Sequence, residues 1–267
     1  MKRAIYLSIL GVITAICVVI GIVRCIGHYA YGKWGGNYGE VVTLDPQSLE
    51  AFEKMDFDMD LLSVNIEEGD DYTISYTASE KLVPEYRVEN GTLYVEQKGD
   101  WKTDFRGGSS RMSVTITVPR DALLENIDMN ADVGDIKIKD IQTQQFTCEA
   151  DVGNVDVKRA KLGTTDISAD VGNVDIRETE LADTQIEASV GNVDMKGVTL
   201  QNTDISADLG NVKVDVNGNK KEYALDLEAE MGDIKVDGNR YHSRVQTEGK
   251  NQLRVNGSMG NVSVDFN

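Results

Sequence analysis

The chain alternates apolar and polar residues over much of its length, a period of two that is typical of β-strands with one buried face. The segment 166–177, DISADVGNVDIR, shows this alternation twice, once on each side of a Gly-Asn pair. Its apolar positions, which we expect to face the core, are Ile167, Ala169, Val171, Val174 and Ile176. Two short strands joined by a sharp corner are therefore predicted for this segment.

The same pattern recurs along the chain as ADVGDIKI, ADVGNVDV, ADVGNVDI, ASVGNVDM, ADLGNVKV, AEMGDIKV and GSMGNVSV. Four spacings of 19 residues between successive glycines are followed by spacings of 22 and 28, so the late units carry insertions. A repeat of this kind is typical of a solenoid in which each unit forms one coil. The glycines, predicted to mark coil corners because glycine reaches positive φ without strain, are Gly134, Gly153, Gly172, Gly191, Gly210, Gly232 and Gly260.

One coil cannot bury its own apolar row, so neighbouring coils must stack and align equivalent residues into internal ladders. The inward positions recur at Ile186, Ala188, Val190, Ile205, Ala207 and Leu209, and a third apolar point per coil is supplied by Leu162, Leu181 and Leu200. Cys148 aligns with Ile167, so we expect a buried thiol and not a nucleophile. The predicted fold is all-β, a single-stack β-solenoid with coils of about 19 residues stacked in sequence order.

Two outward columns carry charge. They consist of Lys137, Asp156, Asp175, Asp194, Lys213, Lys235 and Ser263, and of Lys139, Lys158, Arg177, Lys196, Asp215, Asp237 and Asp265. The order of acid and base flips once along the stack, which sets Lys213 over Asp194. The same flip sets Asp215 over Lys196. Each such pair contributes at most about 1 kcal/mol, but a slipped register turns many of them repulsive, so we interpret the pattern as control of register.

Another acidic column, two positions before each glycine, has no basic partner column. It consists of Asp132, Asp151, Asp170, Ser189, Asp208, Glu230 and Ser258. The carboxylates of Asp132, Asp151, Asp170 and Asp208 offer the oxygen ligands that Ca²⁺ prefers, and Ca²⁺ is the only cofactor that the sequence suggests. The alternative interpretation is a solvated edge beside asparagine ladders, since the nonapeptide Ca²⁺ repeat is absent.

Residues 4–23, AIYLSILGVITAICVVIGIV, form an uncharged stretch long enough to cross the hydrocarbon layer of a bilayer as a helix. We interpret it as a transmembrane signal anchor, with residues 1–3 in the cytoplasm and the folded mass on the extracellular side of the cell membrane. A cleaved signal peptide is the alternative, but the stretch is longer than the usual apolar core of a leader. The membrane is therefore one predicted partner.

Residues 24–54 are predicted to be a juxtamembrane linker. Its last part, QSLEAFEK after Asp45-Pro46, is typical of a short capped helix with proline in the first turn. Glycines just beyond the anchor favour a flexible tether.

The alternation returns at residue 55, and Asn90-Gly91 between two alternating runs indicates a two-residue β-hairpin. We expect residues 55–267 to form one extracytoplasmic solenoid. Its coils are predicted to be irregular over 55–125 and regular over 126–267, without a linker between them. At the far end Phe266 is predicted to cover the last open layer.

Acidic residues outnumber basic ones by 45 to 27, for a formal net charge of −18. Residues 1–33 contain basic residues and no acid, so the negative charge belongs to the part beyond the anchor. Such a field repels phosphate backbones, which argues against nucleic acid as a partner.

The sequence predicts no catalytic residues. His28 and His242 lie far apart, so neither a metal triad nor a Ser-His arrangement is indicated, and carboxylates are too abundant for any pair to stand out. We therefore predict that the chain is not an enzyme. A polysaccharide-acting β-helical enzyme is the less favoured alternative, and the insertions at residues 218–222 and 240–251 are where its site would lie.

The run VTITVPRDALLENIDMNADVGDIKI, followed by GNVDV-like units behind one apolar N-terminal segment, resembles a bacterial membrane-anchored family of unknown function known as "putative adhesin". The resemblance covers about residues 55–267. It implies a β-solenoid ectodomain on the bacterial surface, associated in some members with envelope-stress regulation, and it implies no catalytic residues.

These features predict a membrane-tethered scaffold or interaction module of the cell envelope, which meets a protein or cell-wall component with its flat strand faces. Envelope-stress signalling and adhesion are both compatible with such a module. The alternative is a Ca²⁺-responsive surface protein that uses the exposed aspartate column.

Overall fold

The computed structural model of the chain describes residues 40–98, 112–242 and 244–267. These residues belong to one compact unit of β-strands with a single short 3-10 helix, η2 (Lys220–Glu222). None of the helical structure described is long and apolar enough to cross a membrane. The predicted anchor at residues 4–23 and the chain around it, up to residue 39, lie outside the described residues.

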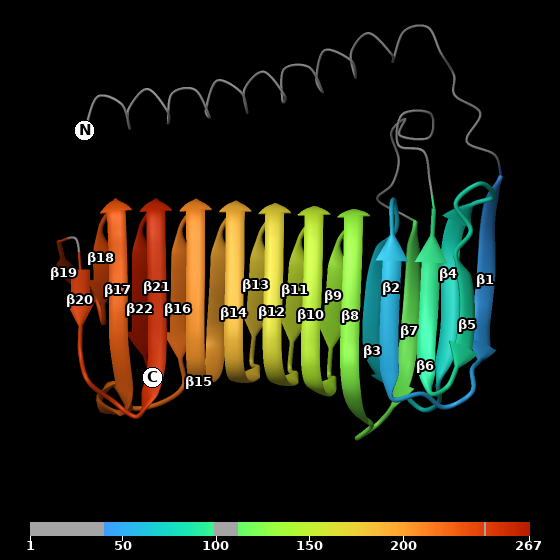
Figure 1. The fold of residues 1–267 in the computed structure, drawn as a ribbon, viewed down its shortest axis with the longest axis horizontal. Coiled ribbons are helices and arrows are strands. Elements are labelled where there is room, and N and C mark those ends of the chain that lie inside the picture. The colour runs from blue at the N-terminus through green and yellow to red at the C-terminus, as the bar shows by residue number, and fades with distance from the viewer. Residues whose placement is uncertain (1–39, 99–111, 243) are drawn as a thin grey trace, which may run out of the picture. The chain divides into compact units, whose positions relative to one another are not determined.

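The strands form two sheets, and each regular coil contributes one strand to each sheet (Figure 1). Sheet A contains, in spatial order, β1 (Val41–Ser48), β4 (Thr73–Ser79), β7 (Ser113–Pro119), β3 (Ser63–Gly69), β9 (Ile136–Lys139), β11 (Val155–Lys158), β13 (Val174–Arg177), the start of β15 (Val193–Leu209), β16 (Val212–Val216), β22 (Val262–Phe266), β18 (Ile234–Val236) and β19 (Asn239–Tyr241). Sheet B contains β5 (Glu85–Glu89), β6 (Thr92–Gln97), β2 (Lys54–Met59), β8 (Leu123–Val133), β10 (Gln142–Val152), β12 (Lys161–Val171), β14 (Glu180–Val190), the rest of β15, β21 (Asn251–Met259), β17 (Tyr223–Met231) and β20 (Arg244–Gln246).

Parallel pairing between coils follows the 19-residue repeat. In sheet B, Ile167 pairs with Cys148 on one side and with Ile186 on the other, and all three side chains are buried. In sheet A, Val174 lies in the same way between Val155 and Val193. The predicted solenoid, its internal ladders and the buried place of Cys148 are therefore confirmed for these coils.

The last coil of the chain does not stack at the end of the solenoid. Strand β21 pairs with β15 on one side and β17 on the other, and β22 lies in the same way between β16 and β18 (Figure 1). The predicted sequential stacking is therefore wrong at this end. The physical reason is that β19 and β20 pair antiparallel with β18 and β17 and cover their outer edges, so that the terminal coil completes ladders on both of its sides.

Phe266 accordingly does not cover an open layer. It pairs with Val216 in sheet A, and its ring lies 5.3 Å from the ring of Tyr223. The backbone N–H of Phe266 donates to Asp237 Oδ1 at 3.0 Å, which ties the end of the chain to the neighbouring coil. The solenoid is closed by short antiparallel strands instead.

The first coils are also rearranged relative to the sequence. Strands β6 and β7 lie outside β2 and β3, and the antiparallel strands β5, β4 and β1 close this end. The hairpin at Asn90-Gly91 is confirmed, with φ of 51° and 76° at its two residues. The short helix predicted after Asp45-Pro46 is wrong, because Asp45 and Pro46 belong to strand β1. An irregularity in the β1–β4 register between Leu44 and Gln47 accommodates the proline, which cannot donate to a ladder.

The corner glycines are required by close packing of the backbone. A Cβ atom on Gly172 would lie 1.7 Å from the carbonyl oxygen of Gly153, and one on Gly260 would lie 1.7 Å from that of Gly210. The short distance between stacked corners is a stronger reason for glycine at these positions than positive φ, which Gly172 does not adopt.

A second corner, which the sequence did not reveal, follows each short strand of sheet A. Asp140, Arg159 and Glu178 occupy it with φ of 59°, 52° and 54°, and Gly197 takes the same place with φ of 63°. Residues other than glycine are strained in this left-handed region, yet four different residue types occupy it, so no repeated residue marks this corner in the sequence.

Candidate interaction face

The outward charges of sheet A are mixed. Asp194 pairs in register with Lys213, so the predicted charge flip is confirmed. Lys196 pairs with Asp215 in the same way. Beyond this point the column departs from the prediction, because Ser263 and not Lys235 follows Lys213. Acids and bases alternate closely enough on this face that neither sign dominates.

The outward face of sheet B is acidic. The acids on its central strands are Glu125, Asp128, Asp132, Glu149, Asp151, Asp166, Asp170, Glu180, Asp183, Glu187, Asp204, Asp208, Asp226, Glu228 and Glu230. Lys161 and Arg254 are the basic residues of these same described strands. Lys161 Nζ lies 3.6 Å from Glu180, and Arg254 Nη1 lies 3.2 Å from Asp204, so both cations are already engaged with acids. From the flanking strands, Lys54 reaches Glu125 at 3.0 Å and Arg244 reaches Asp226 at 2.9 Å. The other acids of this set, most of the total, form no ion pair with a described residue.

The predicted acidic column lies along the edge of this face where the strands of sheet B end. We call it the carboxylate column, and in its true spatial order it consists of Asp132, Asp151, Asp170, Ser189, Asp208, Ser258 and Glu230. The two serines relieve the repulsion, since Ser189 Oγ donates to Asp170 and Ser258 Oγ to Asp208, each at 3.4 Å. At the other end, burial and the nearby carboxylates of Asp60, Asp151 and Asp58 raise the pKa of Asp132.

The carboxylates of this column do not converge into a metal-binding group. Among the residues that the structure describes, no three or more His, Cys, Asp or Glu side chains are placed to hold a metal ion. Asp132, Asp151, Asp170 and Asp208 each come from a different coil. A Ca²⁺ site at these four residues stays a prediction.

An amide ladder runs parallel to the carboxylate column, just beyond the corner glycines. The Asn173 side-chain amide donates to Asn154 Oδ1 at 3.2 Å, and the same oxygen accepts the Asn173 backbone N–H at 3.0 Å. The same contacts recur along Asp135, Asn154, Asn173, Asn192, Asn211 and Asn261, and Asp233 completes the series through its backbone N–H. The ladder satisfies its own polar groups, so it is a structural element of the stack.

Between the carboxylate column and the corner glycines lies a row of exposed or partly exposed apolar side chains, which we call the apolar ridge. It consists of Val133, Val152, Val171, Val190, Leu209, Met259 and Met231. Val171 is 49% exposed, and Val190 and Leu209 are partly exposed, so their predicted inward orientation is wrong. The strand turns into the corner at this residue, so the side chain that follows Asp170 also leaves the core.

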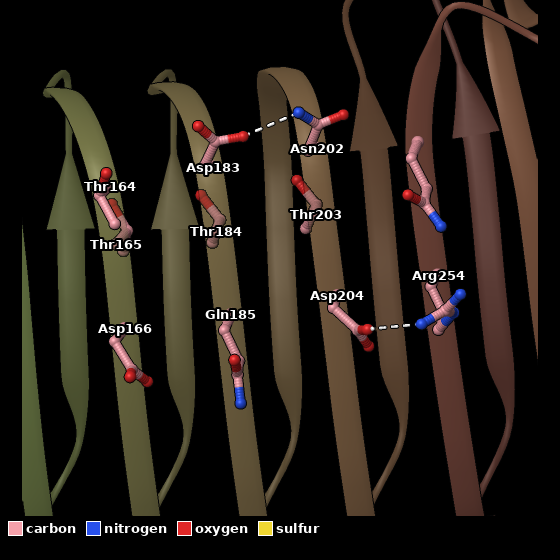
Figure 2. A pocket seen from close by; sticks show the side chains of 11 residues that line it. Thr164, Thr165, Asp166, Asp183, Thr184, Gln185, Asn202, Thr203, Asp204 and Arg254 are labelled. Carbon is pink, nitrogen blue, oxygen red and sulfur yellow. Dashed lines mark hydrogen bonds and ion pairs between the residues drawn. The ribbon is translucent and has the colours of Figure 1, made fainter.

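The same face has a shallow polar recess with a volume of about 380 Å³, at the other end of the strands (Figure 2). Figure 2 shows Asp183 joined to Asn202 and Asp204 joined to Arg254 across its walls, at 2.7 and 3.2 Å. The alternation of apolar and polar residues did not predict this recess.

A stack of threonines lies beneath the recess. Thr165, Thr184 and Thr203 occupy an inward position that Phe146 and Leu253 fill in the flanking coils. The hydroxyl oxygens of Thr184 and Thr203 are buried and make no hydrogen bond within the protein. The signal was visible as threonine at an inward ladder position in three successive repeats.

Residues with catalytic chemistry do not gather on either face. Burial raises the pKa of the Cys148 thiol to about 12, so this thiol is not a nucleophile. His242 lies just beyond β19 in the second of the late insertions, and His28 lies outside the described residues. The insertion at residues 218–222 forms η2, and that at 240–251 forms part of the antiparallel closure of the stack.

Comparison with known proteins places this geometry in context. The family model of Toastrack DUF4097 matches residues 52–249. A comparison with curated proteins finds no match. The chain is similar to the crystal structure of a putative adhesin from Bacteroides fragilis, with 15% identity, a TM-score of 0.56, and coverage of 84% of this chain and 97% of that one. A putative adhesin from Parabacteroides merdae is similar at 12% identity and a TM-score of 0.47, over 86% of this chain and 97% of that one. The similarity to the first of these shows a shared fold.

Proposed function

Because the chain belongs to the Toastrack DUF4097 family and carries one acidic outer face, we propose that it is an adhesin-like interaction module of the bacterial cell surface. The module binds a protein or cell-wall component through the outward face of sheet B. The name of the Bacteroides fragilis protein that shares the fold, putative adhesin, agrees with a binding role.

The observation that carries this proposal is the difference between the two outer faces. Sheet A carries an acidic and a basic column side by side, and the two columns exchange sign where Asp194 meets Lys213, so its outward charges balance. Sheet B stacks acids on its outer face and exposes an apolar ridge at one edge. Exposed apolar side chains beside an unmatched charged face are typical of a surface that contacts another molecule.

The location follows from the sequence. Residues 4–23 are proposed to tether the module to the cell membrane, so that the solenoid works at the extracellular side in adhesion or in envelope-stress signalling. Binding without catalysis is the proposed activity, since neither face of the described chain assembles a nucleophile with a base. A divalent-cation response is the second candidate, and calorimetry of the full chain with Ca²⁺ tests it through heat of binding at millimolar metal or lower.

The main proposal is tested by photo-crosslinking in cells. The full chain carries a photoreactive amino acid at Glu187, outward on sheet B, or in a matched control at Lys196, outward on sheet A. We expect a discrete crosslinked species from Glu187 and a much weaker one from Lys196. If neither position yields a crosslinked partner during growth or under envelope stress, the proposed function is wrong.

A further inference from the structure

The apolar ridge is a continuous strip. Val152, Val171 and Met231 are 47%, 49% and 56% exposed, whereas exposed apolar residues on soluble proteins usually occur singly. Val171 pairs directly with Val152 and with Val190, and the parallel register continues along the other coils. The ends of β8, β10, β12 and β14, where this strip runs, lie in one row in Figure 1. A strip of this kind is typical of a site that a partner covers.

The charge beside the ridge is one-sided. On one flank stands the carboxylate column, in which Asp151 directly precedes Val152 and Asp170 directly precedes Val171. On the other flank stands the amide ladder, which is uncharged over most of its length and already hydrogen-bonded. A complementary partner therefore carries an apolar row with cations along one side. A second copy of this chain, with a net charge of −18, or an anionic lipid surface brings charge of the wrong sign.

The spacing of the ridge favours a helix over an extended strand. Parallel strands lie about 4.8 Å apart, so the ridge presents one apolar side chain at about that interval. An α-helix presents one turn per 5.4 Å, and over four coils it drifts from the ridge by only about 2 Å. An extended strand repeats a face every roughly 6.6 Å and drifts by about 5 Å over the same length, more than a whole coil.

We propose that the apolar ridge and the carboxylate column form a docking edge for an amphipathic α-helix of a protein partner, whose apolar row carries Lys or Arg along one side. The helix lies along the stack with about one turn per coil. Its apolar side chains cover the ridge, and its cations meet Asp151, Asp170 and their equivalents. This proposal rests on the proposed function and names the kind of partner that it requires.

The test uses the full chain in phosphatidylcholine nanodiscs, with empty nanodiscs as the blank. The probes are two labelled synthetic helical peptides of about 18 residues, a length of roughly 27 Å. One is built from Leu and Lys in an amphipathic pattern, and the other replaces every Leu by Gln at unchanged charge. Fluorescence anisotropy measures both affinities, and we expect the Leu peptide to bind at least about tenfold more tightly.

Two pairs of substitutions separate the apolar and charged parts of the edge. Val152→Thr with Val171→Thr keeps the side-chain shape and the strand preference. We expect this pair to lower the affinity for the Leu peptide about tenfold and to leave the affinity for the Gln peptide unchanged. Asp151→Asn with Asp170→Asn is expected to lower the affinity for both peptides and to make both affinities less dependent on salt concentration.

The matched control, Asp156→Asn with Asp175→Asn, removes two stacked acids from sheet A and is expected to leave both affinities unchanged. Equal binding of the two peptides overturns the proposal, as does a control pair that weakens binding as much as the sheet B pair. A partner crosslinked through Glu187 together with equal peptide binding refutes the docking edge and leaves the proposed function standing. A clear preference for the Leu peptide without any crosslinked partner supports the docking edge and refutes the proposed function.

Discussion

Replacement of a corner glycine tests whether close stacking of the coils explains the repeat. In Gly172→Ala the new Cβ would lie 1.7 Å from the Gly153 carbonyl oxygen, and real Cβ atoms are essentially never found closer than 3.0 Å to such a neighbour. The two corners must separate. That movement breaks the hydrogen bond from Gly153 N–H to the Val171 carbonyl (3.0 Å), together with the Val155 N–H bond to the Asn173 carbonyl and the Asn173 N–H bond to Asn154 Oδ1.

Three lost hydrogen bonds at about 1 kcal/mol each predict a loss of about 3 kcal/mol in the free energy of unfolding. For a domain of this size that lowers the melting temperature by roughly 6–12 °C, measurable by circular dichroism or calorimetry. The control is Gly238→Ala, where a Cβ meets nothing within 4 Å and φ of +74° alone predicts a loss of about 1 kcal/mol. If Gly172→Ala destabilises the chain no more than Gly238→Ala, close stacking is not the reason for glycine at the corners.

Three further predictions concern single features of the stack. Glu178→Gly relieves the left-handed backbone at φ of 54°, so its urea midpoint is expected to rise by an amount that corresponds to about 0.5–1 kcal/mol, and a lower midpoint would contradict the assigned strain. Thr184→Val with Thr203→Val removes two buried hydroxyls that lack a partner within the protein, so thermal unfolding should show a gain of about 1 kcal/mol or more per site, whereas a loss would show that the hydroxyls are satisfied. Asp132→Asn removes a carboxyl whose pKa is raised in the folded chain, mainly by burial, so ionised Asp132 destabilises the fold above its folded pKa. The variant should therefore have a higher melting temperature than the original chain at pH 7. This difference in melting temperature should vanish as the pH falls below 3.8, the ordinary pKa of the group.

The repeating part of the fold could be predicted because its information lies within one unit. The 19-residue spacing predicts which residues stack, and the charges at Asp194 and Lys213 predict how two coils align. Such features need only local alternation and the geometry of parallel strands. The same reasoning placed Cys148 in the core correctly, since it needed only the alignment of one repeat with the next.

The order of the coils at both ends could not be predicted in this way. The spacings of 22 and 28 residues indicate insertions in the late coils. They do not indicate that β21 lies between β15 and β17, or that β22 lies between β16 and β18. That arrangement depends on which outer edges the short antiparallel strands cover, a long-range choice that no single repeat encodes.

The candidate site was missed for a related reason. Period-two alternation, extended one residue too far, assigned Val171 to the core, whereas the strand is already turning into the Gly172 corner. The helix predicted near Pro46 failed because the cap and proline signal was local, while pairing of β1 with β4 decided the outcome. Both errors fall where tertiary geometry overrides a short pattern.

Register in this stack is specified more than once, and this bears on where function lies. The buried ladders of both sheets, the amide ladder and the opposite charges that meet at Asp194–Lys213 and Lys196–Asp215 in sheet A all align coils at the same spacing. The acids of sheet B add nothing to that alignment, because like charges in adjacent coils repel each other. Asp132 shows the consequence, since its neighbours Asp60, Asp151 and Asp58 contribute to its raised pKa. The outward face of sheet B weakens the fold slightly and leaves an apolar edge exposed, so we explain it by contact with a partner. The carboxylate column and the apolar ridge are the parts of this face where we expect that contact.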